Sequence, residues 1–117
     1  MSKLFVIVGD SASGKSTLAR IMEAGFRETG RPVTVLDGVE PRHREGLRAI
    51  MRELGKKIDG YWQTVIVTCM EPLPQEFMDQ AERVIEISRP RAFARRRALE
   101  SEGILRRIFR KVFRRFV

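Results

Sequence analysis

Short apolar and β-branched runs alternate along the chain with stretches in which apolar residues recur at helical spacing. Runs of this length predict buried strands, and four are present, at residues 4–8, 33–36, 64–68 and 84–87. The helical pattern fills most of the intervals between them, which predicts helices at residues 16–28, 40–58 and 75–81. The chain therefore alternates strand and helix, with turns predicted at the Gly-, Pro- and Asp-containing boundaries.

This alternation indicates an α/β fold, because strands that are apolar along their whole length belong to parallel sheets covered on both faces. Right-handed crossovers place the carboxyl ends of all the strands at one edge, where ligands bind in such sheets. The 117 residues show no internal linker, so a single domain is expected over residues 1–117. Within it we expect a body at 1–99 and a basic amphipathic helix at 100–117.

A glycine-rich motif connects the first predicted strand to the first predicted helix. Residues 9–16 read GDSASGKS, which matches the phosphate-binding pattern G-x-x-x-x-G-K-[ST] at every fixed position. Its glycines let backbone N–H groups point at the β- and γ-phosphates of a nucleotide, Lys15 adds positive charge there, and the Ser16 hydroxyl is suited to bind Mg²⁺. We therefore expect a nucleoside triphosphate and Mg²⁺ to be held by Gly9, Asp10, Ser11, Ala12, Ser13, Gly14, Lys15, Ser16 and Thr17.

Asp37 follows the second predicted strand and should lie at the same edge of the sheet as the loop. Beside Mg²⁺ it would stay ionised and act as a water-mediated metal ligand or as a base. Asp37 and Lys15 are accordingly the expected catalytic residues, and Ser16 and Asp37 the expected metal ligands. Asp-Gly is also a common turn pair, so a purely turn-forming role for Asp37 stays open.

Two segments resemble adenylylsulfate kinases and related small-molecule P-loop kinases. They are the phosphate loop with its continuation Thr17-Leu18-Ala19, and residues 35–38 followed by Arg42 and His43. The resemblance spans residues 3–97 and is specific mainly in 3–43. It implies a three-layer P-loop NTPase fold with about four parallel strands and an enzyme that moves the ATP γ-phosphate to a small acceptor. It further implies that Asp37 lies near the transferred group and that Arg42 holds an anionic substrate.

Two other functions stay open. Val39 stands where those kinases have a second acid, and little chain remains between Asp37 and the third strand to build an acceptor site. The chain also resembles DNA-translocating and packaging ATPases in the strand ending at Asp37, in the basic segment 52–57 and in residues 64–74. This resemblance implies an ATPase associated with nucleic acid. A nucleotide-binding regulatory protein with little turnover is the third possibility. Tyr61 and Trp62 are expected at an edge, with stacking on a base as the alternative.

The net charge of +8 resides in the last quarter of the chain. Residues 1–89 carry equal numbers of basic and acidic side chains, whereas residues 90–117 carry ten Lys or Arg against two Glu. Apolar pairs recur every four residues in 104–117, which predicts an amphipathic helix whose wide apolar arc packs on the body, on a second copy or in a membrane interface. Its basic arc is expected to attract nucleic acid or an anionic membrane surface.

Cysteine and hydropathy patterns bear on the compartment. The chain has one cysteine, Cys69, which excludes an intrachain disulfide and fits a reducing environment. No charged-then-apolar leader precedes the first strand, and no apolar run approaches the length of a membrane-spanning helix. We therefore expect a cytoplasmic protein.

Overall fold

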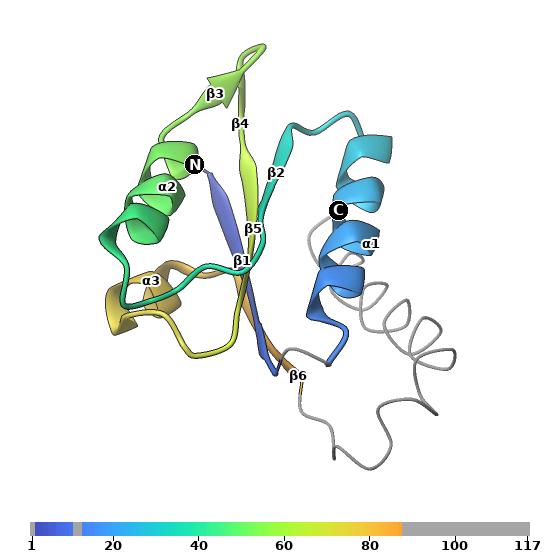
Figure 1. The fold of residues 1–117 in the computed structure, drawn as a ribbon. Helices are drawn as coiled ribbons and strands as arrows, with labels where there is room; N and C mark the ends of the chain where they lie inside the picture. The colour runs from blue at the N-terminus through green and yellow to red at the C-terminus, as the bar shows by residue number, and fades with distance from the viewer. Residues whose placement is uncertain (1, 11–12, 88–117) are drawn as a thin grey trace.

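The computed structural model describes residues 2–10 and 13–87. Its main sheet contains four parallel strands, β1 (Lys3–Gly9), β2 (Val33–Leu36), β5 (Thr64–Cys69) and β6 (Arg83–Ile87). Their order across the sheet is β2-β5-β1-β6, so β1 and β5 are central. The helices of this part are α1 (Lys15–Glu28), α2 (Arg44–Leu54) and α3 (Gln75–Gln80). Figure 1 shows α1 on one side of the sheet and α2 and α3 on the other.

This arrangement confirms the predicted α/β fold with a parallel sheet between two helical layers. Every residue of β5 is buried, and every residue of β1 after Lys3 is buried as well. A strand with helices on both faces has no solvent side, so its sequence is apolar throughout instead of alternating. The four predicted strands and the helices at the positions of α1 and α3 are therefore confirmed, with boundaries that differ by one or two residues.

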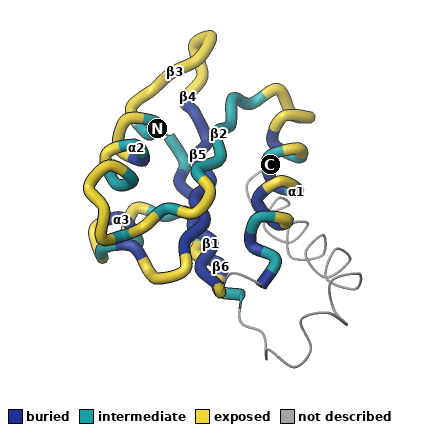
Figure 2. The backbone as a smooth tube through the Cα atoms, in the orientation of Figure 1, coloured by how far each residue is buried: buried dark blue, intermediate teal, exposed yellow. Residues whose placement is uncertain are grey.

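Each face of the sheet buries its own hydrophobic cluster, because successive side chains of a strand point to opposite faces. The cluster under α1 consists of Phe5, Ile7, Leu18, Ala19, Met22, Phe26, Ile66 and Ile85. The cluster under α2 and α3 consists of Leu4, Val6, Val8, Ile50, Val65, Val67, Cys69, Leu73 and Phe77. Figure 2 shows the buried residues concentrated in the central strands and on the sides of the helices that face them. These clusters fix the position of the sheet edge that carries the loop.

The helix predicted at 40–58 is wrong at both ends. Pro41 lies in a turn before the helix, because His43 is extended (φ −99°, ψ 122°) and is the residue from which α2 starts. At the other end α2 stops before Gly55, and a small antiparallel hairpin follows, formed by β3 (Lys57–Ile58) and β4 (Tyr61–Trp62). Its turn has positive φ at both Asp59 (52°) and Gly60 (84°), the geometry that joins tight hairpins. The turn was predicted correctly but the strands beside it were not.

The amphipathic helix predicted at 100–117 lies outside the described residues, as do Ser11 and Ala12 of the loop. The division of the chain at residue 99 therefore stays a prediction. Within the described ranges, no helix has the length and apolar character needed to cross a membrane.

Gly9 is required by close packing at the end of β1. A methyl group there would lie 2.6 Å from the carbonyl oxygen of Ile87 and 2.5 Å from Ser13 Oγ. A backbone oxygen in a strand cannot move away without disturbing the sheet, so Gly9→Ala should lower the free energy of unfolding by about 1–3 kcal/mol. Urea unfolding followed by circular dichroism measures this effect.

Gly55→Ala is the matched control for this substitution. The nearest atom to an added methyl group at Gly55 is 3.6 Å away, and its φ of −89° suits any residue. We expect the control to unfold close to the wild-type midpoint. Equal midpoints for the two variants would contradict the close-packing argument.

Candidate functional site

The loop after β1 curls around a single backbone carbonyl. The Asp10 carbonyl oxygen accepts hydrogen bonds from Ser13 N (3.0 Å), Ser13 Oγ (2.7 Å) and Lys15 Nζ (3.1 Å). Gly14 then adopts a left-handed conformation (φ 89°, ψ 15°) directly before α1, which explains why a glycine is needed there. The first N–H groups of α1 have no partner inside the helix, so they are available to an anion in front of it.

Lys15 is the first residue of α1 and is 7% exposed. Its ammonium group therefore lies over the loop rather than in open solvent, held by the Asp10 carbonyl. Ser16 is partly buried and Thr17 is exposed one residue further along the same helical turn. The described part of the loop thus has the order of groups that its sequence motif predicts.

The carboxyl ends of β2 and β5 bring an acid and two hydroxyl groups together. Ser16 Oγ donates to Asp37 at 3.1 Å from each carboxylate oxygen. Thr68 Oγ1 donates to Asp37 Oδ1 and accepts a hydrogen bond from Gly38 N at 2.8 Å. The Thr68 carbonyl oxygen also accepts from Val39 N at 2.9 Å. Thr68 therefore fixes three consecutive residues, and the acid that follows β2 is held against the serine of the loop.

This environment stabilises the charged form of Asp37. The hydrogen bond from Thr68 makes the largest contribution and lowers the pKa of the Asp37 carboxyl, whereas burial raises this pKa. The Ser16 hydroxyl and the charges of Lys15 and Arg20 lower the pKa further. The net direction is below the ordinary value, so Asp37 is ionised at neutral pH. Because this pKa is lower in the folded state, the stabilisation is present above the unfolded-state pKa and is lost as the pH falls through the folded-state value.

A cleft of about 470 Å³ opens beside these groups. The residues that line it come from the loop, from the segment after β2 and from the end of β5: Lys15, Ser16, Asp37, Gly38, Val39, Glu40, Pro41, Met70 and Glu71. The cleft is large enough for a small ligand next to the Ser16–Asp37 pair. It lies at the carboxyl edge of the sheet, where the strand pattern predicted a site.

Arg42 does not line this cleft, although the sequence made it a candidate for substrate binding. It is exposed and lies 3.7 Å from Glu71, an ion pair at the rim of the cleft. Exposed pairs of this kind contribute little stability, so the guanidinium can exchange Glu71 for another anion at small cost. The structure thus brings Arg42 close to the cleft without bringing it to the Ser16–Asp37 pair.

Cys69 and His43 take no part in this arrangement. Burial raises the pKa of the Cys69 thiol to about 11, and its Sγ lies 3.7 Å from the Ile7 carbonyl oxygen, which describes an unreactive thiol packed in the core. His43 is exposed at the start of α2. Among residues 2–10 and 13–87, no three His, Cys, Asp or Glu side chains are grouped to hold a metal ion. A metal here would depend on Ser16, Asp37, ligand oxygens and water.

Comparison with known proteins gives two findings that bear on this geometry. Residues 1–55, just under half of the chain, match the family model described as adenylylsulphate kinase. This range contains the loop, Asp37 and Arg42. It is a P-loop kinase-like segment. A search of curated proteins gave no match.

The whole fold is similar to one described as "Crystal structure of APE1195". The TM-score is 0.50 at 19% sequence identity, over 94% of this chain and 72% of that one. At this identity the likeness concerns the fold alone, and it supports the α/β P-loop architecture of the chain around its P-loop kinase-like segment.

Sequence reasoning missed Thr68, which lies beyond the P-loop kinase-like segment and holds Asp37 of that segment in place. The available signal was a hydroxyl residue near the end of a strand that is otherwise apolar, at the edge where the loop was expected. Its partner could not be identified, because that requires knowing that β2 and β5 are neighbours. The register pairs Leu36 with Val67, so the next residues, Asp37 and Thr68, come side by side.

Replacing Thr68 tests how Asp37 is held. Thr68→Val keeps the shape but removes the hydroxyl, so the pKa of Asp37 should rise toward its ordinary value. Thr68→Ser keeps the donor and should leave the pKa low. Carbon-detected NMR titration of the Asp37 carboxyl group measures both variants. An unchanged pKa in Thr68→Val would assign the lowering to the other neighbours.

Proposed function

We propose that this protein binds Mg-ATP and transfers the γ-phosphoryl group to a small acceptor. The observation that supports this most directly is the contact between the loop serine and an ionised acid. Ser16 Oγ lies 3.1 Å from both oxygens of Asp37, beside Lys15 and at the wall of an open cleft. The similarity of residues 1–55 to adenylylsulphate kinases supports ATP as the nucleotide.

The chain's own groups would bind the triphosphate. The first backbone N–H groups of α1, which follow Gly14, would face the phosphates, since a helix N-terminus favours negative charge. Lys15 would leave the Asp10 carbonyl and pair with phosphate oxygens, replacing a neutral acceptor by a charged one. In phosphoryl transfer most of the acceleration comes from such positioning and charge stabilisation.

The donor set near Asp37 suits Mg²⁺, which prefers oxygen ligands and keeps several waters. Ser16 offers a hydroxyl oxygen and Asp37 a carboxylate that is already ionised. Bound there, Mg²⁺ would supply charge neutralisation at the β- and γ-phosphates. A lowered pKa makes Asp37 a poor proton acceptor at neutral pH, which supports the metal-ligand role over that of a general base.

The acceptor would enter the cleft beside Asp37. Residues 38–41 form one wall, and Met70 and Glu71 form another. We propose that Arg42 attracts an anionic acceptor by exchanging its ion pair with Glu71, a residue that lines the cleft. An acceptor in this cleft would lie next to Lys15 and Ser16 of the phosphate loop, which also line it.

Lys15→Ala tests nucleotide binding. Removing the buried ammonium group leaves the phosphates without this charge, and a tenfold or greater loss of Mg-ATP affinity requires only about 1.4 kcal/mol. Isothermal titration calorimetry measures the dissociation constant. Lys57→Ala, which removes an exposed lysine from the hairpin, is the control and should bind as the wild type does. Equal affinity of Lys15→Ala and wild type would refute the nucleotide site.

Asp37→Asn tests the chemistry. The amide keeps the size and an oxygen that can accept from Thr68, but it removes the charge and the second acceptor oxygen facing Ser16, so turnover should fall by at least about tenfold. The melting temperature should fall only by the small stabilisation that the charge contributes. The rate of ATP consumption and the chemical form of the product are followed by phosphorus NMR with a panel of hydroxyl-bearing acceptors.

Asp59→Asn is the matched control, because Asp59-Gly60 repeats the Asp-Gly pair in a turn away from the cleft. Its turnover should equal that of the wild type. Unaltered turnover in Asp37→Asn would show that Asp37 forms a turn and takes no part in the chemistry. Mg-ATP binding by the wild type with no phosphorylated product from any acceptor, or from water, would contradict the proposed transfer and leave a nucleotide-binding protein.

A further inference from the structure

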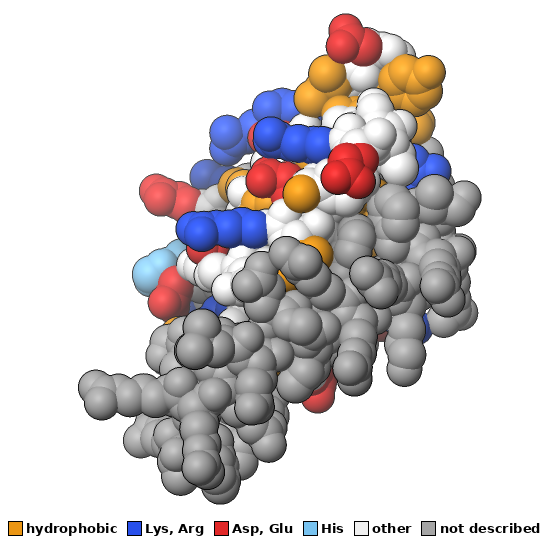
Figure 3. All heavy atoms as spheres, turned by 90° about the vertical axis from the view of Figure 1, so that its right-hand side faces the viewer, with side chains coloured by type: hydrophobic (Ala, Val, Ile, Leu, Met, Phe, Trp, Pro, Cys, Tyr) orange, Lys and Arg blue, Asp and Glu red, His pale blue; other side chains and the backbone are white. Residues whose placement is uncertain are grey.

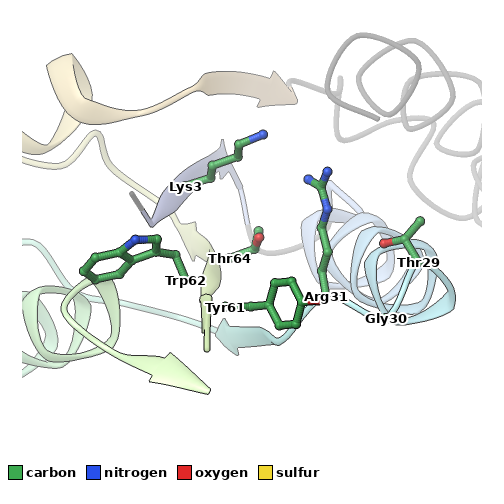
Figure 4. A pocket seen from close by; sticks show the side chains of 7 residues that line it. All are labelled: Lys3, Thr29, Gly30, Arg31, Tyr61, Trp62 and Thr64. Carbon is green, nitrogen blue, oxygen red and sulfur yellow. The ribbon is translucent and has the colours of Figure 1, made fainter. Parts of the chain in front are cut away.

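A second cleft, of about 500 Å³, lies at the end of the sheet opposite the phosphate loop. It is lined by Lys3, Thr29, Gly30, Arg31, Tyr61, Trp62 and Thr64, which Figure 4 shows. Lys3 and Thr64 are the first residues of β1 and β5, whereas the phosphate loop follows the last residue of β1. The proposed phosphoryl transfer uses none of these residues.

Two exposed aromatic rings form one wall of this cleft. Tyr61 is 65% exposed and Trp62 is 42% exposed, and both belong to β4 of the hairpin. Hydrophobic side chains gather at this end of the molecule in Figure 3. The Nζ of Lys57 lies 4.6 Å from the centroid of the Trp62 ring, so a cation covers part of that ring. Adjacent exposed rings beside a cleft are suited to stack on a planar ligand.

The hairpin is held at its base by a buried polar network around Gln63, which is 2% exposed. Gln63 Nε2 donates to the carboxylate and, at 3.3 Å, to the carbonyl oxygen of Glu53, while Thr34 Oγ1 donates to Gln63 Oε1 at 2.7 Å. Gln63 N also donates to the Lys56 carbonyl oxygen at 3.2 Å. The rings are therefore exposed on an anchored element, tied to both α2 and β2.

The described residues that line the cleft include two cations and no acid. Lys3 extends into it from β1 and Arg31 from the loop between α1 and β2 (Figure 4). Asp59, in the turn of the hairpin, is the acid nearest in sequence to the two rings and does not line the cleft. A ligand that matches these walls has a planar aromatic part joined to a negatively charged part.

We propose that this cleft binds single-stranded nucleic acid, with bases stacked on Tyr61 and Trp62 and the adjoining phosphates beside Lys3 and Arg31. Every base has an aromatic face, so rings that flank cations bind strands with little dependence on sequence. A duplex keeps its bases stacked inside and cannot present them to these rings. A lipid surface is flat, whereas the rings and cations here surround a concave space.

The chain carries its own reporter for this site, because Trp62 is its only tryptophan and Tyr61 its only tyrosine. Titration of the full chain with a short oligodeoxythymidylate should quench the tryptophan fluorescence to saturation. Raising the salt concentration should weaken the binding, since phosphate contacts release counterions. The same titration with Lys15→Ala should give the wild-type affinity, which separates this site from the proposed nucleotide site.

Tyr61→Ala removes one ring and keeps the Trp62 reporter, so affinity should fall about tenfold if a base stacks there. Met51→Ala is the matched control, because Met51 is 53% exposed on α2 and does not line the cleft. The control should bind the strand as tightly as the wild type does. Anisotropy of an end-labelled strand gives the dissociation constants independently of the tryptophan signal.

Four results would overturn the proposal. Binding of the labelled strand without any change in Trp62 fluorescence would place nucleic acid elsewhere on the chain, and so would equal affinity of Tyr61→Ala and wild type for the strand. Thymidine monophosphate that quenches Trp62 at the same concentration as the strand would show a site for a free nucleotide. Absence of binding by both measurements would remove nucleic acid as the ligand.

Discussion

The candidate site depends on the parallel pairing of β5 with its two neighbours. Pairing with β1 sets Thr68 opposite Ile7, two residues before Gly9, and pairing with β2 sets Val67 opposite Leu36. Three strand ends therefore meet at one edge, and the groups that follow them come into contact without any long connection. The hydrophobic clusters on both faces maintain this register, because a slip by one residue would turn every buried side chain to the opposite face.

Sequence alone predicts those parts of the molecule whose causes are local. The central strands are recognisable because burial on two faces demands unbroken apolar runs, and the loop is recognisable because Gly9, Gly14 and Lys15 each meet a separate local requirement. The hairpin at residues 57–62 was missed because its four strand residues are all exposed and leave no burial pattern. The partnership of Thr68 with Asp37 was missed because it joins residues 31 positions apart.

The two clefts belong to opposite ends of the same sheet and differ in chemistry. The cleft at the carboxyl edge has an ionised acid at its wall, Asp37, and an arginine only at its rim. The cleft at the amino edge has cations and aromatic rings and no acid among its described lining residues. Charge thus favours a metal-bound phosphate at one end and an unchelated polyanion at the other. Helix α2 spans the interval, since it begins near the first cleft and ends at the hairpin.

The hydrogen bonds of the loop also bear on how tightly a nucleotide can bind. Before binding, Lys15 is held by the Asp10 carbonyl and Ser16 by Asp37, so neither side chain has to be ordered by the ligand. Exchanging the neutral carbonyl acceptor of the Lys15 ammonium for a charged phosphate oxygen adds the attraction of opposite charges to the hydrogen bond. The exchange is therefore favourable at Lys15 without a large cost in side-chain entropy. Because Thr68 holds Asp37 in place and favours its charged form, the same holds for a metal ion that arrives with the phosphates.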